Sequence, residues 1–304
     1  MKKIVSVIGQ GFVGGSVTEG LANTYDIYAC DISGKSSPSA TWATKDINEL
    51  VSMSEKSINF SDVYFICLPT PMKSSGECDV SIVETVLTQL SKFSGKRIAV
   101  VKSTVPPGST AKWNSMFSDT GLTIVFNPEF LTEANAVEDF KNQNRIIVGG
   151  PRPSSGTVKQ LFQSAFPKVP IVKTSSTIAE MIKYVTNCFL ATKVSFANEI
   201  FQICSELNID YDKVIEYARY DERLGHSHWS VPGPMALDDN SNLPAYGFGG
   251  SCFPKDLNAL IFLAKALNVE PHVLKGTWQK NLEVRPQKDW QNLKGRAISD
   301  DDKD

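Results

Sequence analysis

Net charge is nearly absent from this sequence of 304 residues. Its 31 Lys and Arg residues are balanced by 33 Asp and Glu residues, which leaves a formal charge of −2 at pH 7. A chain this close to neutral has no general positive field to attract nucleic acid or an anionic membrane. We therefore expect no nucleic-acid partner and no membrane partner, although a local basic cleft is compatible with this balance.

Long apolar runs and paired cysteines are missing as well. No run approaches the roughly 18 apolar residues of a membrane-spanning helix, and the N-terminal residues enter a strand pattern without a small-residue cleavage site. No Cys-x-x-Cys pair occurs among the six cysteines, which are Cys30, Cys67, Cys78, Cys188, Cys204 and Cys252. Their mostly apolar surroundings favour a reducing compartment. We therefore expect a cytoplasmic protein.

Metal-ligand patterns are equally sparse. His226 and His228 alternate as metal ligands can, but no third ligand with suitable spacing accompanies them. We expect no metal site, and we predict loop or hydrogen-bonding roles for both histidines.

Strand and helix patterns alternate through the first part of the chain. Apolar strand patterns occupy residues 4–8, 26–30, 62–68, 97–102 and 122–126, with further strands of the same sheet at 145–150 and 170–173. Such alternation predicts a parallel sheet that binds ligands beyond the carboxyl ends of its strands. The fold class we predict is α/β, with an N-terminal Rossmann-type doubly wound parallel sheet followed by an all-α domain with a long central helix.

A glycine-rich turn follows the first strand pattern. Its spacing is Gly-x-Gly-x-x-Gly, and an acid follows about twenty residues later at the end of the second strand. The glycines would make a tight turn, admit a pyrophosphate and pack a helix on the strand, while the acid would accept from a ribose 2′-hydroxyl. That acid would repel a 2′-phosphate, so the pattern favours NAD over NADP, the alternative being a Rossmann turn that binds no phosphate. The predicted NAD-binding residues here are Gly9, Gly11, Phe12, Val13, Gly14 and Asp31.

Polar segments follow several of the predicted strands. Because the carboxyl ends of parallel strands meet at one edge, these segments should line one crevice, although each alone could simply end a strand. Glu129 and Glu133 would share a face of a helical turn, and one of them could act as a base near a nicotinamide. Surface solvation is the alternative explanation for this acid pair. The residues predicted to line the cofactor crevice are Pro69, Thr70, Ser103 and Thr104.

Residues 178–207 contain no glycine or proline. As one helix they would extend roughly 45 Å, and their apolar character on most faces predicts a buried domain axis or a subunit interface. Lys183 and Asn187 lie four residues apart, so a cation and an amide would project side by side and could form an oxyanion hole. An ordinary solvated pair is the alternative, but a lysine on so apolar a helix needs a counter-charge or a ligand.

A cysteine lies on a glycine-rich turn near the C-terminal end. Cys252 follows Gly247, Gly249 and Gly250, and an apolar-periodic helix pattern covers residues 257–267. A helix N-terminus and the neighbouring Lys255 would both favour a thiolate. The alternative is a buried, inert cysteine in a capped glycine loop.

Composition and pattern suggest three regions. We expect an NAD-binding Rossmann-type domain at residues 1–174, a helical dimerisation and catalytic domain at 175–290, and a disordered acidic tail at 291–304. A further helix should cover residues 271–285, and the polar, turn-rich residues 237–246 should form an exposed loop.

Six sequence blocks in order carry a resemblance to a known family. Besides the glycine turn of residues 9–14, they are residues 103–106 (Ser-Thr-Val-Pro), 127–133 (Asn-Pro-Glu-Phe-Leu-Thr-Glu), 180–187 (Glu-Met-Ile-Lys-Tyr-Val-Thr-Asn), 221–225 (Asp-Glu-Arg-Leu-Gly) and 247–256 (Gly-Phe-Gly-Gly-Ser-Cys-Phe-Pro-Lys-Asp). From residue 4 to about residue 285, the chain resembles the UDP-glucose/GDP-mannose dehydrogenases. It is most similar to a short UDP-glucose 6-dehydrogenase type without the usual C-terminal UDP-binding domain.

The resemblance implies a four-electron oxidation. Family members oxidise a sugar C6 hydroxymethyl to a carboxylate with two NAD, through a thiohemiacetal and a thioester on a cysteine. By resemblance, Cys252 is that nucleophile, Lys183 and Asn187 stabilise the oxyanions, and Glu129, Thr104 and Asp256 handle the proton and the hydrolytic water.

The resemblance also implies binding roles. Glu133 would lie beside the nicotinamide, Lys255 would meet phosphate or cofactor, and Arg223 would reach the substrate of the neighbouring subunit across a homodimer built on the long helix. The second of the two oxidations is the step that calls for a thiol, because a thiohemiacetal gives the aldehyde carbon a hydride to lose. The substrate-binding residues implied are Phe130, Leu131, Lys183, Asn187, Arg223, Phe248 and Gly249.

The sequence departs from the family in length. Typical members carry a second Rossmann-like domain after the helical one, so this chain is expected to be either a short form or a fragment. The stretch of residues 227–246 is longer than usual, and we hypothesise that it replaces part of the nucleotide cover. Two other functions stay open: a two-electron NAD-dependent hydroxyacid dehydrogenase with Lys183 as base, and a non-catalytic NAD-binding dimer.

Overall fold

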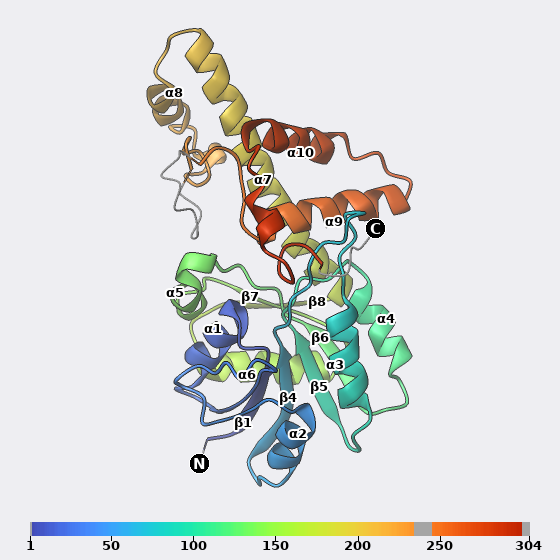
Figure 1. Ribbon diagram of the computed structural model, residues 1–304. Helices are drawn as coiled ribbons and strands as arrows, with labels where there is room; N and C mark the ends of the chain where they lie inside the picture. Colours follow the sequence, from blue (N-terminus) through green and yellow to red (C-terminus); the bar gives the residue numbers. More distant parts are fainter. Residues whose placement is uncertain (1, 234–244, 300–304) are drawn as a thin grey trace. The chain divides into compact units, whose positions relative to one another are not determined.

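The computed structural model describes residues 2–233 and 245–299 of the chain (Figure 1). The chain divides into two compact units. Unit 1 comprises Met1–Thr70 and Val80–Lys183, and unit 2 comprises Pro71–Asp79 and Tyr184–Asp304.

Unit 1 is built on one sheet of eight strands, in the order β3-β2-β1-β4-β5-β6-β7-β8. The strand bounds are β1 Ile4–Ile8, β2 Asp26–Cys30, β3 Trp42–Thr44, β4 Phe60–Ile66, β5 Arg97–Val101, β6 Leu122–Phe126, β7 Ile146–Gly149 and β8 Ile171–Thr174. Strand order reverses between β1 and β4, since β1 pairs with β2 on one side and β4 on the other. Open α/β sheets bind ligands beyond the strand ends at such a reversal.

Helices cover both faces of this sheet (Figure 1). Alternate residues of β4 enter different cores: Tyr64 and Ile66 join a cluster with residues of α2, α3 and α4, whereas Val63 and Phe65 join a cluster with residues of α1 and α6. The helix bounds are α1 Phe12–Leu21, α2 Ile47–Glu55, α3 Ser81–Ser91, α4 Ser109–Met116, α5 Ala136–Lys141 and α6 Ser154–Ala165. This two-sided covering confirms the α/β prediction and explains the continuous apolar runs of the central strands.

The last two strands correct the expectation of a wholly parallel sheet. β7 pairs antiparallel to β6 through Phe126 and Gly149, and β8 runs parallel to β7. A parallel return would need a crossover element along the sheet. The β6–β7 connection contains only the 3-10 helix Glu133–Asn135 and the six-residue α5. The chain therefore enters β7 from the edge at which β6 ends.

Unit 2 contains most of the longest helix, α7, together with α8, α9 and α10. Their bounds are α7 Ser176–Glu206, α8 Tyr211–Ala218, α9 Cys252–Ala266 and α10 His272–Val284. The predicted long helix and the helix at 271–285 are thus confirmed, and α9 begins at Cys252 itself. A small core joins α7 to α8 and the following loop through Ala197, Cys204, Tyr211, Ile215, Trp229 and Val231.

The segment Pro71–Asp79 belongs to unit 2 although it follows β4 in the chain. Met72 donates a backbone hydrogen bond to Ala297, and Ser299 donates one back to Met72. The sequence prediction of a disordered tail from residue 291 is therefore wrong for residues 297–299, which pair with this segment, and Ala297 is fully buried. Residues 300–304 lie outside the described residues, as does most of the loop predicted at 237–246, which falls on residues 234–244.

Within residues 2–233 and 245–299, no helix combines the length and apolar character that crossing a bilayer requires. The same described residues contain no group of three or more His, Cys, Asp or Glu side chains arranged to hold a metal ion.

Candidate functional site

The glycine turn after β1 has two glycines that the fold itself requires. Gly9 has φ +87°, and a Cβ there would lie 2.3 Å from the Cys67 carbonyl oxygen. A Cβ on Gly14 would lie 1.8 Å from the Gly9 carbonyl oxygen. At Gly11, by contrast, a Cβ would meet nothing within 4 Å. The protein alone gives no steric reason for glycine at position 11, whereas a pyrophosphate approaching the backbone does, so the turn fits a dinucleotide.

Asp31, directly after β2, is fixed as an acceptor. Its Oδ2 accepts from the Gln10 N–H at 2.7 Å, and its Oδ1 accepts from the Ser33 N–H at 2.9 Å and Oγ at 2.6 Å. Burial alone would raise the pKa of Asp31, but the hydrogen bonds from Ser33 and Gln10 hold it below the usual value. The carboxylate is therefore ionised at neutral pH and tied to the glycine turn, as ribose binding requires.

Two predicted cofactor residues, Phe12 and Glu133, line one pocket of about 560 Å³. Phe12 begins α1, and Glu133 begins the 3-10 helix before α5. Ser37 and Pro38 also line this pocket. Val13 is half-buried and packs against the core that includes Val17 and Leu21 of α1.

The loops after β4 and β5 are joined to each other. Leu68 N–H donates to Ser103 Oγ at 2.9 Å, and Thr70 Oγ1 donates to the Thr104 carbonyl at 2.7 Å. Thr70, Ser103 and Thr104 are all buried, whereas Pro69 is exposed. The predicted crevice residues of these two strands thus belong to one connected strand edge.

Lys183 and Glu129 form a buried ion pair in unit 1. Lys183 Nζ donates to Glu129 Oε1 and to the Glu129 carbonyl, each at 2.8 Å, and both side chains are at least nine-tenths buried. Glu129 Oε2 accepts from the Leu131 N–H at 2.8 Å. Burial would raise the pKa of Glu129, but the ammonium of Lys183 and these hydrogen bonds lower it. The counter-charge that the sequence predicted for Lys183 is therefore Glu129.

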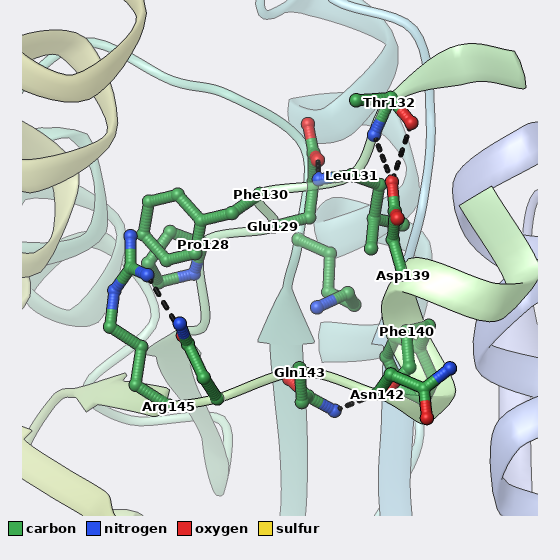
Figure 2. Close-up of a pocket in the computed structure, with 12 residues that line it drawn as sticks. Pro128, Glu129, Phe130, Leu131, Thr132, Asp139, Phe140, Asn142, Gln143 and Arg145 are labelled. Carbon is green, nitrogen blue, oxygen red and sulfur yellow. Dashed lines mark hydrogen bonds between the residues drawn. The ribbon is translucent and has the colours of Figure 1, made fainter. Parts of the chain in front are cut away.

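A pocket of about 300 Å³ opens beside this pair, between residues 128–132 and 139–145 (Figure 2). Phe130 and Leu131 both line it. The Arg145 guanidinium lies over the Phe130 ring, 4.2 Å from its centroid, and Lys183 Nζ lies 5.9 Å from the same centroid. Two cations thus hold the ring of Phe130 as one wall next to the Lys183–Glu129 pair.

Cys252 is the first residue of α9 in unit 2. It is half-buried, whereas the other five cysteines are buried, and its Sγ lies 3.7 Å from Ser251 Oγ. Burial raises the pKa of Cys30 and of Cys67 to about 12, so these two thiols stay protonated at neutral pH. Accessibility and a helix N-terminus therefore distinguish Cys252 from the buried thiols.

Asp256, one turn after Cys252, has a partner on each oxygen. Asn187 Nδ2 donates to Oδ2 at 2.6 Å, and Lys255 Nζ donates to Oδ1 at 2.5 Å. Burial would lower the pKa of Lys255, but the negative charge of Asp256 raises it well above the usual value. Lys255, predicted to meet phosphate or cofactor, is thus paired with Asp256 within unit 2.

The turn of residues 247–250 is clamped by residues that the sequence did not point to. Asn281 accepts from the Phe248 N–H at 2.7 Å and donates to the Phe248 carbonyl at 3.0 Å. Arg285 Nε donates to Asp289 Oδ1 at 2.6 Å, and Asp289 Oδ2 accepts from the Gly250 N–H at 3.1 Å. A Cβ on Gly249 would lie 2.3 Å from the Asp289 carboxylate. Phe248 and Gly249 are therefore held rigidly ahead of Cys252.

Arg223 lies apart from these groups, in the 3-10 helix Glu222–Leu224. Its side chain is 89% exposed and forms a two-pronged ion pair with Asp221. His226 Nδ1 lies 2.7 Å from the Arg219 guanidinium, and burial lowers the pKa of His228.

A reversing α/β sheet with a glycine turn and an ionised acid after β2, followed by a helical unit, defines the class of dinucleotide-binding proteins with a Rossmann-type fold. Residues 40–166 match the NAD binding domain of the UDP-glucose/GDP-mannose dehydrogenase family, and residues 177–283 match the central domain of that family. NAD is accordingly the cofactor of this protein.

Individual relatives agree with these matches. The UDP-glucose 6-dehydrogenase TuaD of Bacillus subtilis is 31% identical over 94% of this chain and 64% of its own length. The UDP-glucose 6-dehydrogenase AglM of Haloferax volcanii is 30% identical over 91% of this chain and 69% of its own length. The solved UDP-glucose dehydrogenase of Pyrobaculum islandicum is 26% identical with a TM-score of 0.74, over 96% of this chain and 71% of that one.

The chain belongs to the UDP-glucose/GDP-mannose dehydrogenase family. It spans less than two thirds of the length of the Bacillus relative.

Proposed function

We propose that this protein oxidises the C6 hydroxymethyl group of a nucleotide sugar, UDP-glucose, to a carboxylate with two NAD⁺. The balanced reaction converts RCH₂OH, H₂O and two NAD⁺ into RCOO⁻, two NADH and three H⁺. The observation that carries the proposal is the position of Cys252 at the start of α9, with the buried and fully partnered Asp256 one turn later. Relatives named UDP-glucose 6-dehydrogenases support the choice of substrate.

Cys252 is the residue that binds the substrate covalently between the two oxidations. When held by the glycine turn and Asp31, NAD⁺ would supply the hydride acceptor for each of the two oxidations. After the first, the C–S bond forms as the Cys252 thiol adds to the aldehyde, and the thiol proton passes to the new hydroxyl. The second oxidation turns this thiohemiacetal into a thioester, and water then displaces the thiolate to give the carboxylate.

Lys183 and Asn187 stabilise the oxyanions of these steps. They lie one helical turn apart on α7, and each already donates to a buried carboxylate, Glu129 for Lys183 and Asp256 for Asn187. Donors held by such partners are oriented before the reaction begins and need little rearrangement in the transition state.

Glu129, Thr104 and Asp256 handle the protons and the hydrolytic water. Glu129 is kept ionised by Lys183, and an ionised carboxylate can accept the proton of a hydroxyl or of water. Phe130, Leu131, Phe248 and Gly249 provide walls and backbone contacts for the sugar, and the two aromatic residues are held in place by Arg145 and Asn281.

We propose a homodimer through α7, in which Arg223 reaches the substrate of the partner. Several large apolar side chains on α7 are exposed, including Val185 at 56%, Phe189 at 63% and Ile203 at 48%. Their separations of four and fourteen residues return them to similar faces of a helix, as expected for a helix-on-helix interface. Phe189→Glu and Ile203→Glu should produce monomers in light scattering, whereas Val273→Glu on α10, also exposed, should not.

The domain limits stay a prediction. We keep residues 1–174 as the NAD-binding domain and residues 175–290 as the helical domain, and the family matches, which end at 166 and resume at 177, support this division.

The test is the stoichiometry of NADH per UDP-glucose consumed. We expect two NADH per UDP-glucose for the wild type and at most one for Cys252→Ala. Cys204→Ala, which removes a buried thiol, is the control and should still give two NADH per UDP-glucose. One NADH per substrate together with full activity of Cys252→Ala would instead identify a two-electron hydroxyacid-type dehydrogenase. NAD binding without NADH across a panel of UDP- and GDP-sugars would identify a non-catalytic NAD-binding dimer.

A further inference from the structure

Lys102, directly after β5, is a buried cation without a carboxylate partner. Its side chain is 3% exposed, and its Nζ donates to Asn127 Oδ1 at 2.8 Å and lies 3.5 Å from the Asn127 carbonyl. No carboxylate oxygen among the described residues lies within 4.0 Å of this ammonium. Besides these acceptors, only the Phe140 ring lies near the ammonium among the described residues, 5.6 Å from its centroid. Burying such a charge costs stability, and buried groups of this kind occur preferentially at functional sites.

The position of Lys102 connects it with the Lys183–Glu129 pair. Lys102 and Glu129 line the same pocket of about 300 Å³, and Asn127, which holds Lys102, lies two residues before Glu129 at the end of β6. Asn127 Nδ2 in turn donates to the Ile147 carbonyl of β7 at 2.7 Å. Through Asn127, the ammonium is therefore connected to the ends of three neighbouring strands.

Three titratable groups act on the pKa of Lys102. Burial lowers its pKa to about 8, Cys67 and Glu129 act to raise it, and Lys183 acts to lower it. The pKa of Cys67 is itself raised to about 12 by burial, so this thiol is neutral near pH 8. Asp139 and Arg145 also line the pocket, but Asp139 accepts from Thr132 and Arg145 stacks on Phe130.

The consequence is one of charge balance. Lys183 and Glu129 alone sum to zero, and a neutral pair stabilises a developing oxyanion weakly. With Lys102 protonated, the three groups carry a net charge of +1, and the charges of Lys183 and Lys102 both lower the pKa of Glu129. In a buried site such a net charge acts strongly on a nearby oxyanion.

We propose that Lys102 is a positioning residue whose ammonium, anchored by Asn127, gives the Lys183–Glu129 pair the net positive charge that stabilises the substrate oxyanion. This inference rests on the proposed function and deepens it. Lys102 does not touch the reacting atoms. It acts through Glu129 and Lys183, and its loss therefore affects the transition state more than substrate binding.

The experiment compares Lys102→Met and Lys102→Arg with the wild type over pH 6 to 10. Wild-type kcat should fall as the pH rises through about 8, where Lys102 loses its proton. Lys102→Met should lower kcat at pH 7 on the order of 10-fold to 100-fold with KM little changed, somewhat less than loss of a direct oxyanion donor. It should also abolish the alkaline fall. Lys102→Arg should retain activity and move the fall to higher pH, because arginine keeps its proton.

Lys112→Met is the matched control, because Lys112 is an exposed lysine of α4 and its loss should leave both kcat and the pH profile unchanged. An alkaline fall that persists unaltered in Lys102→Met would overturn the proposal. NMR of ¹³Cε-labelled lysine supplies a readout that needs no turnover and that also decides the matter if Lys102→Arg does not fold. A Lys102 signal that titrates near pH 8 supports the proposal, and one that titrates near its ordinary value of about 10.4 overturns it. A wild type that oxidises no nucleotide sugar would defeat the proposed function, and the NMR titration would still decide the charge of Lys102.

Discussion

Asn187 of α7 donates a 2.6 Å hydrogen bond to Asp256 of α9, and this contact joins the two helices within unit 2. Lys255 occupies the other oxygen of the same carboxylate. Asp256 therefore has a fixed orientation one turn from Cys252, while the amide of Asn187 has a fixed direction. The amide and the acid that the sequence assigned to separate tasks are thus structurally coupled, so changing either one alters the other.

Asp256→Asn tests this coupling. The amide side chain cannot act as a base and leaves Lys255 without its counter-charge, so hydrolysis of the thioester should slow by about 10²- to 10⁴-fold. The acyl-enzyme should accumulate on Cys252 and be visible by intact-protein mass spectrometry after incubation with NAD⁺ and UDP-glucose. Asp119→Asn, at an exposed position of unit 1, serves as control. Wild-type turnover of Asp256→Asn without adduct would rule out its role in hydrolysis.

The buried Lys183–Glu129 pair predicts a stability effect that is not additive. Glu129→Gln leaves the Lys183 ammonium buried without a counter-charge, which typically costs about 3–5 kcal/mol. Removing the charge as well, in Glu129→Gln/Lys183→Met, should recover part of that loss. Urea unfolding of the two single variants and the double variant measures the coupling. Strictly additive losses would show that the two charges do not stabilise each other.

The hydrogen bonds that hold the turn before Cys252 predict that the free energy of unfolding depends on pH in the acidic range. Burial would raise the pKa of Asp289, but the hydrogen bonds from Arg285 and Gly250 lower it. A carboxyl group whose pKa is lowered by folding stabilises the protein above its unfolded pKa of about 3.9, and this contribution is lost as the pH falls through the folded value.

Unfolding in urea between pH 7 and pH 3 measures this effect. Asp289→Asn should be less stable than the wild type at pH 7, and the difference should shrink toward pH 3. A difference that stays constant over this range would indicate that the ionised form of Asp289 is not what holds the turn.

Much of unit 1 could be predicted because its signals are local. A glycine turn after an apolar strand, with an acid at the end of the next strand, specifies β1, α1 and β2 within residues 4–31. The direction of β7 was not predictable in this way, since an apolar run has the same composition whether it runs parallel or antiparallel to its neighbour. Elements without a sequence prediction, such as the three-residue β3 and α6, lack a long periodic pattern or contain a glycine.

The residues that hold the site side chains in place could not be predicted from local sequence patterns. Asn281 holds Phe248 from 33 residues away, and Lys102 meets Asn127 across 25 residues. Glu180 accepts from the N–H groups of Gly108 and Thr110 at 2.6 and 2.8 Å, about seventy residues earlier in the chain. Residue type suggested Cys252 and Lys183, because thiols and charges on apolar helices are conspicuous, whereas Asp256 was indicated only by the family resemblance. The amides and backbone groups that orient them become apparent only once the chain is folded.

Glu180 itself provides a stability prediction. It is fully buried, and burial raises its pKa although the N–H groups at the start of α4 counter that effect. Glu180→Gln keeps one acceptor oxygen and turns an NH₂ group toward a backbone N–H, so the free energy of unfolding should fall by about 1–3 kcal/mol. Urea unfolding at pH 7 measures this change. Glu216→Gln, on the surface of α8, is the control, and equal stability of the two variants would contradict the capping role of Glu180.

The glycine turn permits a prediction that separates cofactor binding from folding. Gly11→Ala adds a methyl group that meets no protein atom within 4 Å, so stability should change little. The same methyl group would occupy the space in which a pyrophosphate approaches the backbone, and the Kd for NAD⁺ should rise at least about tenfold. Gly14→Ala should instead destabilise the protein, because its Cβ would lie 1.8 Å from the Gly9 carbonyl oxygen.

Gly156→Ala in α6 is the matched control for this pair. Its Cβ would also meet nothing within 4 Å, and it lies in a helix, where alanine is favoured over glycine by about 0.5–1 kcal/mol. We expect this variant to be slightly more stable than the wild type with unchanged NAD⁺ affinity. Calorimetric titration with NAD⁺ and thermal unfolding of all three variants therefore distinguish the two kinds of glycine. If Gly11→Ala bound NAD⁺ as tightly as Gly156→Ala does, the glycine at position 11 would not mark the approach of the pyrophosphate, and the turn would have to hold the cofactor through other contacts.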